Sequence, residues 1–157
     1  MSYRTSIDGV QIFGNNDYFP EWADFIKANG IEIDEDGCYF GYLYDVKGLF
    51  EVIDSITRKL IAEQHENVEK GLKNYVTGEP YREMTDLSDS MWFNEKTPLL
   101  MFNMRMVNDT YLFLPYQVYL ILKDKIEHTD SYESNGIEWF LCAYKLKEGE
   151  KIEVRAG

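Results

Sequence analysis

The short β-prone runs of this chain are joined by tight turns rather than by helices, and this pattern limits the possible folds more than any other feature. Asp8-Gly9 lies between two such runs within residues 3–13. It is the residue pair that a type I′ hairpin turn prefers, because both central positions need positive φ. Two further hairpins are expected, one over 31–33, 34–37 and 38–44, the other over 99–107, 108–109 and 110–114. Hairpins outnumber any βαβ pattern, so we predict a single α+β domain over residues 1–157 with a mainly antiparallel sheet.

Three helices are predicted beside these strands. The longest spans about 46–74, with Asp45 as its N-cap, and its apolar residues keep helical spacing. A second, over about 115–127, is apolar around most of its circumference, which predicts a buried helix or an oligomer interface. A shorter helix begins near Pro20 and ends at Asn29-Gly30, a pair typical of left-handed C-terminal caps.

The C-terminal part of the chain is expected to return to β-structure. Strands are predicted at 137–144 and at 151–154. Basic and acidic residues alternate along the second of these segments, which is typical of a solvated edge strand. Residues 78–98 give the weakest indication of any secondary structure, and a short helix over 85–93 is one option there.

The cysteines and the longest uncharged run indicate an intracellular protein without a membrane anchor. Cys38 and Cys142 are too few to form a disulfide framework in a chain of 157 residues, so we expect both to be reduced and buried. The longest run without a charge, 110–122, is too short to span a bilayer and contains Pro115. The N-terminus lacks the pattern of a signal peptide. We therefore expect a cytoplasmic protein that does not bind membranes.

No metal, cofactor or catalytic site is predicted. The segment 32–37 matches the first half of an EF-hand loop, but Leu43 stands where the bidentate Glu is required. His65 and Glu69 share a helix face, yet a zincin site needs a second histidine at position 69. The only other histidine is His128, and no GxSxG motif supports a nucleophile. The sequence therefore favours a binding protein over an enzyme.

Negative charge is concentrated near the start of the chain. Of the net charge of −12, the first 45 residues hold nine carboxylates against Arg4 and Lys27. Such a surface repels nucleic-acid backbones and membranes and attracts basic proteins. Aromatic residues between the carboxylates could serve as anchors in an interface. The predicted partner-binding residues are Asp17, Tyr18, Glu21, Trp22, Asp24, Asp34, Glu35, Asp36 and Tyr39.

In composition, though not in any motif, this acidic and aromatic part resembles small inhibitor proteins such as nuclease immunity proteins and the anti-restriction and anti-CRISPR proteins of phages. The resemblance implies a basic protein partner, such as a nuclease or another nucleic-acid-binding protein, inhibited by a surface that imitates nucleic-acid charge. One alternative is a small-molecule-binding protein or small enzyme, with a pocket between the sheet and the long helix lined by Tyr42, Tyr44 or Trp139. Another is a homo-oligomeric structural subunit that self-associates through the helix at 115–127.

Overall fold

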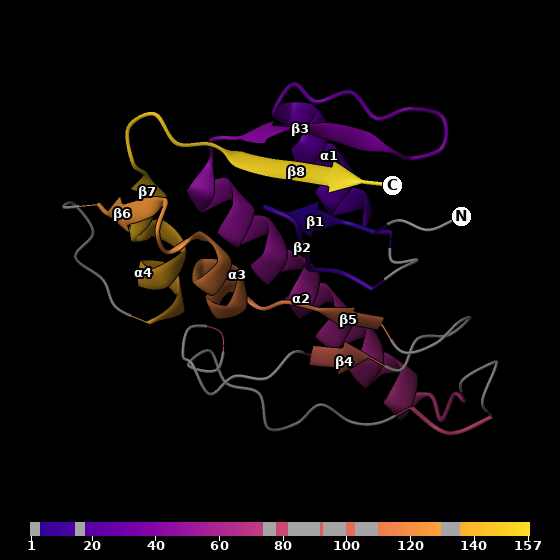
Figure 1. Cartoon of the computed structure of the whole chain (residues 1–157). Coiled ribbons are helices and arrows are strands. Elements are labelled where there is room, and N and C mark those ends of the chain that lie inside the picture. Colours follow the sequence, from indigo (N-terminus) through magenta and orange to yellow (C-terminus); the bar gives the residue numbers. More distant parts are fainter. Residues whose placement is uncertain are drawn as a thin grey trace.

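The computed structural model describes residues 4–14, 18–73, 78–81, 92, 100–102, 110–129 and 136–157, with the backbone alone at 100–102, 110 and 111 (Figure 1). The predicted fold class is confirmed: the fold is α+β, with antiparallel sheets and one long helix. Among the described residues, no helix is long and apolar enough to span a bilayer.

The main sheet has four antiparallel strands in the order β2-β1-β8-β3. Their bounds are β1 Ser6–Ile7, β2 Val10–Gln11, β3 Tyr39–Leu43 and β8 Ile152–Ala156. The hairpin between β1 and β2 is confirmed, because Asp8 and Gly9 both have positive φ, 48° and 82°. One face of the sheet is buried and carries Ile7, Leu43 and Val154. The other face carries exposed Phe40, with the Arg155 guanidinium 5.3 Å from its ring centroid.

The prediction of an edge strand near the C-terminus is wrong, because β8 lies inside the sheet. Ser6 of β1 and Phe40 of β3 both face Arg155, one from each side. The alternating charges of this segment belong to its solvent-facing side, whereas Ile152 and Val154 are fully buried on the other side. An antiparallel sheet with one solvated face produces this alternation in central strands as well as in edge strands.

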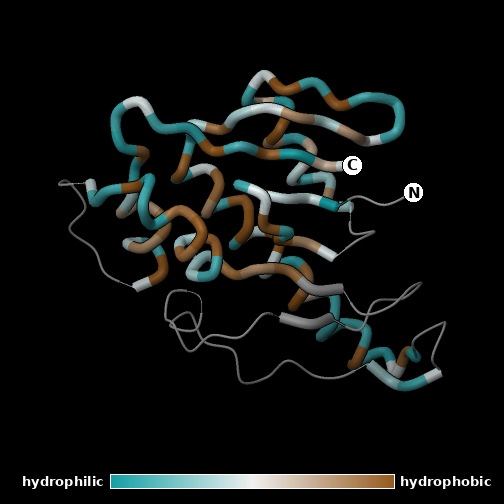
Figure 2. Tube along the Cα trace, in the orientation of Figure 1, coloured by the Kyte–Doolittle hydropathy of each residue, from teal (hydrophilic) through white to brown (hydrophobic). Residues whose placement is uncertain are grey.

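The long helix is confirmed as α2, Val46–Glu69, and it ends short of the predicted residue 74. The Asp45 side chain accepts a hydrogen bond from the Gly48 N–H at 2.8 Å, as expected of an N-cap. α2 runs beneath the sheet and contacts α1, α3, α4 and β7 (Figure 1). Hydrophobic residues recur along its first turns, while its far end is hydrophilic (Figure 2). Its buried residues are Val46, Leu49, Phe50, Ile53, Ile56, Thr57, Leu60 and Gln64.

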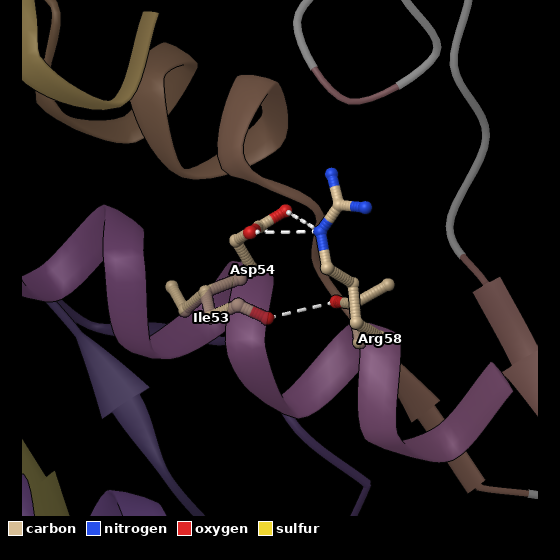
Figure 3. A network of polar contacts seen from close by, with 4 residues as sticks. Ile53, Asp54 and Arg58 are labelled. Carbon is tan, nitrogen blue, oxygen red and sulfur yellow. Dashed lines mark hydrogen bonds and ion pairs between the residues drawn. The ribbon is translucent and has the colours of Figure 1, made fainter. Parts of the chain in front are cut away.

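Asp54 and Arg58 form a polar network on α2 (Figure 3). The Arg58 Nε–H donates to both carboxylate oxygens of Asp54, at 3.1 and 3.0 Å. The same guanidinium lies 5.2 Å from the centre of the Trp92 ring. Arg58 therefore joins two turns of the helix and holds a buried tryptophan from another segment against α2.

The short helix near Pro20 is confirmed as α1, Pro20–Ala28. It ends in a Schellman motif, with Gly30 at φ 80°. The Gly30 N–H donates to the Lys27 carbonyl at 3.0 Å, and the Ile31 N–H donates to the Ile26 carbonyl at 3.3 Å. The predicted strand at 31–33 is wrong, because β3 pairs with β8 instead.

The C-terminal half differs from the prediction in two elements. The predicted helix over 115–127 is α3, Pro115–Leu122, and it is followed by strand β6, Ile126–His128, which pairs with β7, Tyr144–Leu146. The predicted strand over 137–144 is instead the helix α4, Ile137–Cys142. Its buried residues, Ile137, Phe140 and Leu141, are spaced i, i+3 and i+4, so one helix face serves the core. Burial of α3 is confined to Pro115, Val118 and Leu122.

The remaining strands form the hairpin β4, Leu100–Phe102, with β5, Thr110–Leu112, as predicted from the runs around 108–109. The predicted turn at 108–109 lies outside the described residues, and so does the optional helix over 85–93 except for residue 92. Both cysteines are free thiols, but each is half-buried rather than buried. The prediction that Cys38 and Cys142 are buried is therefore wrong.

Candidate partner-binding face

A small apolar pocket lies where the start of α1 meets the turn before β3. Its volume is about 30 Å³, room for about two water-sized groups. The pocket is at the surface, because the side chain of Tyr18, which is 60% exposed, forms part of its wall. The residues that line it are Thr5, Phe13, Tyr18, Phe19, Trp22, Ala23, Ile33, Gly37, Tyr39 and Ala156.

Aromatic rings that pack edge-on fix the α1 side of the pocket. Phe13 meets Phe19 edge-on, with ring centroids 4.9 Å apart, and it meets Trp22 edge-on at 5.1 Å. Pro20 begins the helix directly after Phe19, so the chain passes from the pocket wall into α1 within one residue. Tyr18 precedes this rigid cluster and remains exposed at the rim.

A hydrogen bond between α1 and the sheet closes the floor of the pocket. The Trp22 Nε1–H donates to the Tyr39 hydroxyl at 2.5 Å. Burial raises the pKa of Tyr39, and this effect outweighs the hydrogen bonds from Trp22 and Thr5, which lower it. The tyrosine is therefore held in its neutral form, and its hydroxyl oxygen is already occupied.

The acidic turn at 34–37 stands next to the pocket, because Ile33 and Gly37 on either side of Asp34–Asp36 both line it. The N–H groups of Asp36 and Cys38 each donate to Asp34 Oδ1 at 2.9 Å. Gly37 has φ 82°, and its N–H donates to the Asp34 carbonyl at 3.1 Å. Asp34 thus builds the turn, and these contacts account for the spacing that resembles half of an EF-hand loop.

The predicted partner-binding residues divide into those that remain on this surface and those that do not. Glu35 and Asp36 are exposed at the tip of the turn, and Asp24 is exposed directly after Ala23 of the pocket wall. Glu21 forms an ion pair with Lys59 of α2 at 2.5 Å, and the hydrogen bond from Lys59 lowers the pKa of this carboxyl. The charge of Glu21 therefore contributes mainly to the packing of α1 against α2.

Among the predicted aromatic anchors, only Tyr18 stands out from the surface. Trp22 is 4% exposed and belongs to the core, and Tyr39 is half-buried beneath the pocket. Asp17 lies outside the described residues. The structure therefore brings Tyr18, Trp22 and Tyr39 to one pocket but gives them different roles: rim, wall and floor.

Sequence reasoning missed the pocket residues that come from distant segments. Thr5 is on the way into β1, Phe13 follows β2, and Ala156 ends β8. Each is an ordinary core residue by its neighbours in sequence. No local signal could have placed them together, because their proximity depends on β8 entering the sheet between β1 and β3.

The aromatic residues of the alternative pocket have separate neighbours. The Lys151 Nζ lies 4.0 Å from the Tyr42 ring centroid, on the solvent side of the sheet, and Tyr44 is 64% exposed. Trp139 instead belongs to a ring cluster of α3, α4, β6 and β7, with the His128 ring centroid 5.7 Å away. In the same cluster, burial is the main cause that raises the pKa of Tyr144 to about 12.

Metal-ligating side chains do not gather in the part of the chain that is described. No group of three or more His, Cys, Asp or Glu side chains is close enough there to hold an ion. His65 and Glu69, the pair singled out in the sequence, contact each other at 3.2 Å as an exposed pair one turn apart on α2.

Comparison with protein-family models, with curated proteins and with solved structures finds no match to this chain.

Proposed function

We propose that this chain is a cytoplasmic, non-enzymatic binding domain that holds a basic protein against the face formed by Tyr18, Asp24, Glu35 and Asp36. The observation that supports it most is that exposed Tyr18 lines an apolar pocket whose lining residues Ala23 and Gly37 are followed and preceded in sequence by the exposed Asp24 and Asp36, with Glu35 exposed in the same turn. An aromatic rim around a small apolar hollow supplies contact area, and carboxylates around it supply attraction for cations. We name this set of four residues the acidic face.

The favoured role is inhibition of a nuclease or another nucleic-acid-binding protein. Such targets carry basic clefts, and an acidic face occupies a basic cleft in place of a phosphate backbone. The same charge disfavours direct binding of nucleic acid by this chain. This mode of action is the one used by immunity and phage anti-defence proteins, which the chain resembles in composition, and it makes an accessory role in a phage or mobile element the natural context.

The experiment compares three versions of the chain as baits in a nuclease-treated lysate of the source cells, washed at low and high salt. One is the natural chain, one has its acidic face reversed, and one has the same charge change elsewhere. The face variant carries Asp24→Lys, Glu35→Lys and Asp36→Lys, and the control variant carries Glu63→Lys, Glu148→Lys and Glu150→Lys. Asp34 is left unchanged because its carboxylate builds the turn.

The proposal expects one basic nucleic-acid-handling protein on the natural and control baits, lost at high salt and absent from the face variant. That protein is then assayed for its own activity with and without the natural chain. Recovery of the same proteins on all three baits would contradict the proposal, as would a captured protein whose activity the chain leaves unchanged.

Self-association through α3 is a second role that one observation favours. Leu120 is 45% exposed on this helix, and Tyr116 and Tyr119 are half-buried beside it. Sedimentation over a wide concentration range tests it, with Leu120→Asp as the variant that should remain monomeric. A natural chain that stays monomeric throughout the range would rule this role out.

A further inference from the structure

We propose that the pocket of the acidic face accepts the tip of one aliphatic side chain from a partner segment that carries Lys or Arg beside it. This inference rests on the proposed binding function and adds the chemistry that the face would recognise. It follows from three properties of the pocket: its size, the pairing of its polar atoms and the charges next to it.

The size of the pocket selects a small group. A volume of about 30 Å³ corresponds to about two water-sized spheres. The branched end of Leu, Ile or Val, or the methylthio end of Met, fits this space. A phenyl or indole ring is larger than this space, and the lining rings of Phe13, Phe19 and Trp22 already pack edge-on against each other. The pocket is likewise far smaller than the roughly 300–1,000 Å³ typical of small-molecule sites.

The pairing of the polar atoms selects an apolar group. The Trp22 Nε1–H and the Tyr39 hydroxyl are bonded to each other, and Thr5 also bonds to Tyr39. Apart from the hydroxyl of the exposed Tyr18, the rest of the lining is hydrocarbon or backbone, from residues such as Ala23 and Ile33. A charged or amide group in this pocket would lose water without gaining a partner, which is unfavourable. The tip of an aliphatic side chain has no hydrogen bonds to water that it would lose on entering the pocket.

The charges next to the pocket select the neighbours of that aliphatic residue. Asp36 directly precedes Gly37 of the pocket wall, and Asp24 directly follows Ala23 of the opposite segment. Both carboxylates are exposed, and a partner residue seated in the pocket brings its own neighbours close to them. Basic side chains on those neighbours complete the charge complementarity. The face therefore fits a short basic segment with one aliphatic residue within it.

Defined peptides test this without knowledge of the natural partner. The probes are capped heptapeptides, Gly-Lys-Arg-X-Arg-Lys-Gly, in which X is Leu, Ala or Phe, so that charge and length stay constant. Binding to the full chain is followed by NMR at the Trp22 indole N–H and the Gly37 amide. The Leu peptide should bind at least about tenfold more tightly than the Ala peptide, because its side chain is three carbon atoms larger and a single methylene in an apolar pocket is already worth about tenfold. The Phe peptide should show no such gain.

Variants of the chain separate this inference from the proposed function. Ala23→Val fills the pocket and should abolish the advantage of the Leu peptide, whereas Ala28→Val, the same change at an exposed position of α1, should leave it intact. Reversal of Glu35 and Asp36 to Lys should weaken all three peptides alike. If the Leu and Ala peptides bind equally tightly, and both bind more weakly after the charge reversal, the inference is overturned and the proposed function stands. If the reversal of Glu35 and Asp36 leaves the affinity of the peptides unchanged, the proposed function is contradicted. If Ala23→Val does not fold, the comparison among the three peptides still decides.

Discussion

Replacement of Gly41 by alanine should destabilise the protein through a single contact beneath β3. A Cβ at this position would lie 2.7 Å from Ile31 Cγ1 and 2.8 Å from Ile31 Cδ1. These distances are far shorter than a carbon–carbon contact of about 3.5–4.0 Å. Ile31 is 8% exposed, and it packs beneath the strand where Gly41 faces Val154. The added methyl therefore forces a buried side chain to move.

Two opposing contributions set how much Gly41→Ala changes the free energy of unfolding. Extra volume in a packed core costs about 1–3 kcal/mol. Replacing a glycine by alanine in allowed backbone returns about 0.4–1 kcal/mol through the unfolded chain. We expect the steric term to win and the free energy of unfolding to fall by about 1–2 kcal/mol. For a chain of this size the melting temperature should then fall by roughly 2–8 °C.

Urea denaturation of four proteins measures the contact itself: the natural chain, Gly41→Ala, Ile31→Ala and the double variant. Ile31→Ala alone should cost about 2–5 kcal/mol, because it leaves a cavity. In the double variant the new methyl fills part of that cavity, so its loss should be smaller than the sum of the two single losses by at least about 1 kcal/mol. Additive losses, or a Gly41→Ala protein more stable than the natural chain, would refute this packing of Ile31 against β3.

Three further predictions concern charges and caps. The pKa of Tyr144 is raised to about 12 from its usual 10, so the free energy of unfolding should be unchanged below pH 10 and should fall between pH 10 and 12. Alkaline unfolding of the natural chain, followed by the absorbance of tyrosinate and compared with that of Tyr144→Phe, measures this. Glu21→Gln removes the ion pair with Lys59 and should cost at most about 1 kcal/mol in urea denaturation at neutral pH, and the cost should vanish in acid, below the lowered pKa of Glu21. Asp45→Ala removes the N-cap bond to Gly48 and should cost about 1 kcal/mol, seen as a lower melting temperature by circular dichroism, whereas Asp45→Asn should retain most of it.

Local turn and cap chemistry made several elements predictable. Asp8-Gly9 forms its hairpin, Gly30 ends α1 in the left-handed conformation, and Asp45 caps α2. In each case a few neighbouring residues decide the backbone conformation, so the sequence contains the whole cause. The ends that these residues set are accordingly close to those observed, whereas the far end of α2 lies at Glu69 rather than at the predicted residue 74.

Where pairing partners are distant, the prediction failed. The segment 137–142 is rich in residues that favour strands, yet its core contacts recur at helical spacing and it folds as α4. The central place of β8 depends on β1 and β3, more than a hundred residues away in sequence. For the candidate site, the acidic turn and the aromatic residues of α1 were predictable as a group. The pocket between them was not, because Thr5 and Ala156 reach it only through the completed sheet.

The position of β8 also has a consequence for how the chain reaches its native state. Since β8 separates β1 from β3, the sheet needs Ser6 and Phe40 to meet Arg155. Closing loops of this length costs conformational entropy that the contacts repay only once they have formed. A nascent chain that still holds 152–156 inside the ribosome has no strand to join β1 to β3, and the apolar side of α2 lacks its cover. Assembly of the main sheet therefore waits for 152–156, and until this strand pairs, the inner faces of β1 and β3 are open to non-native partners.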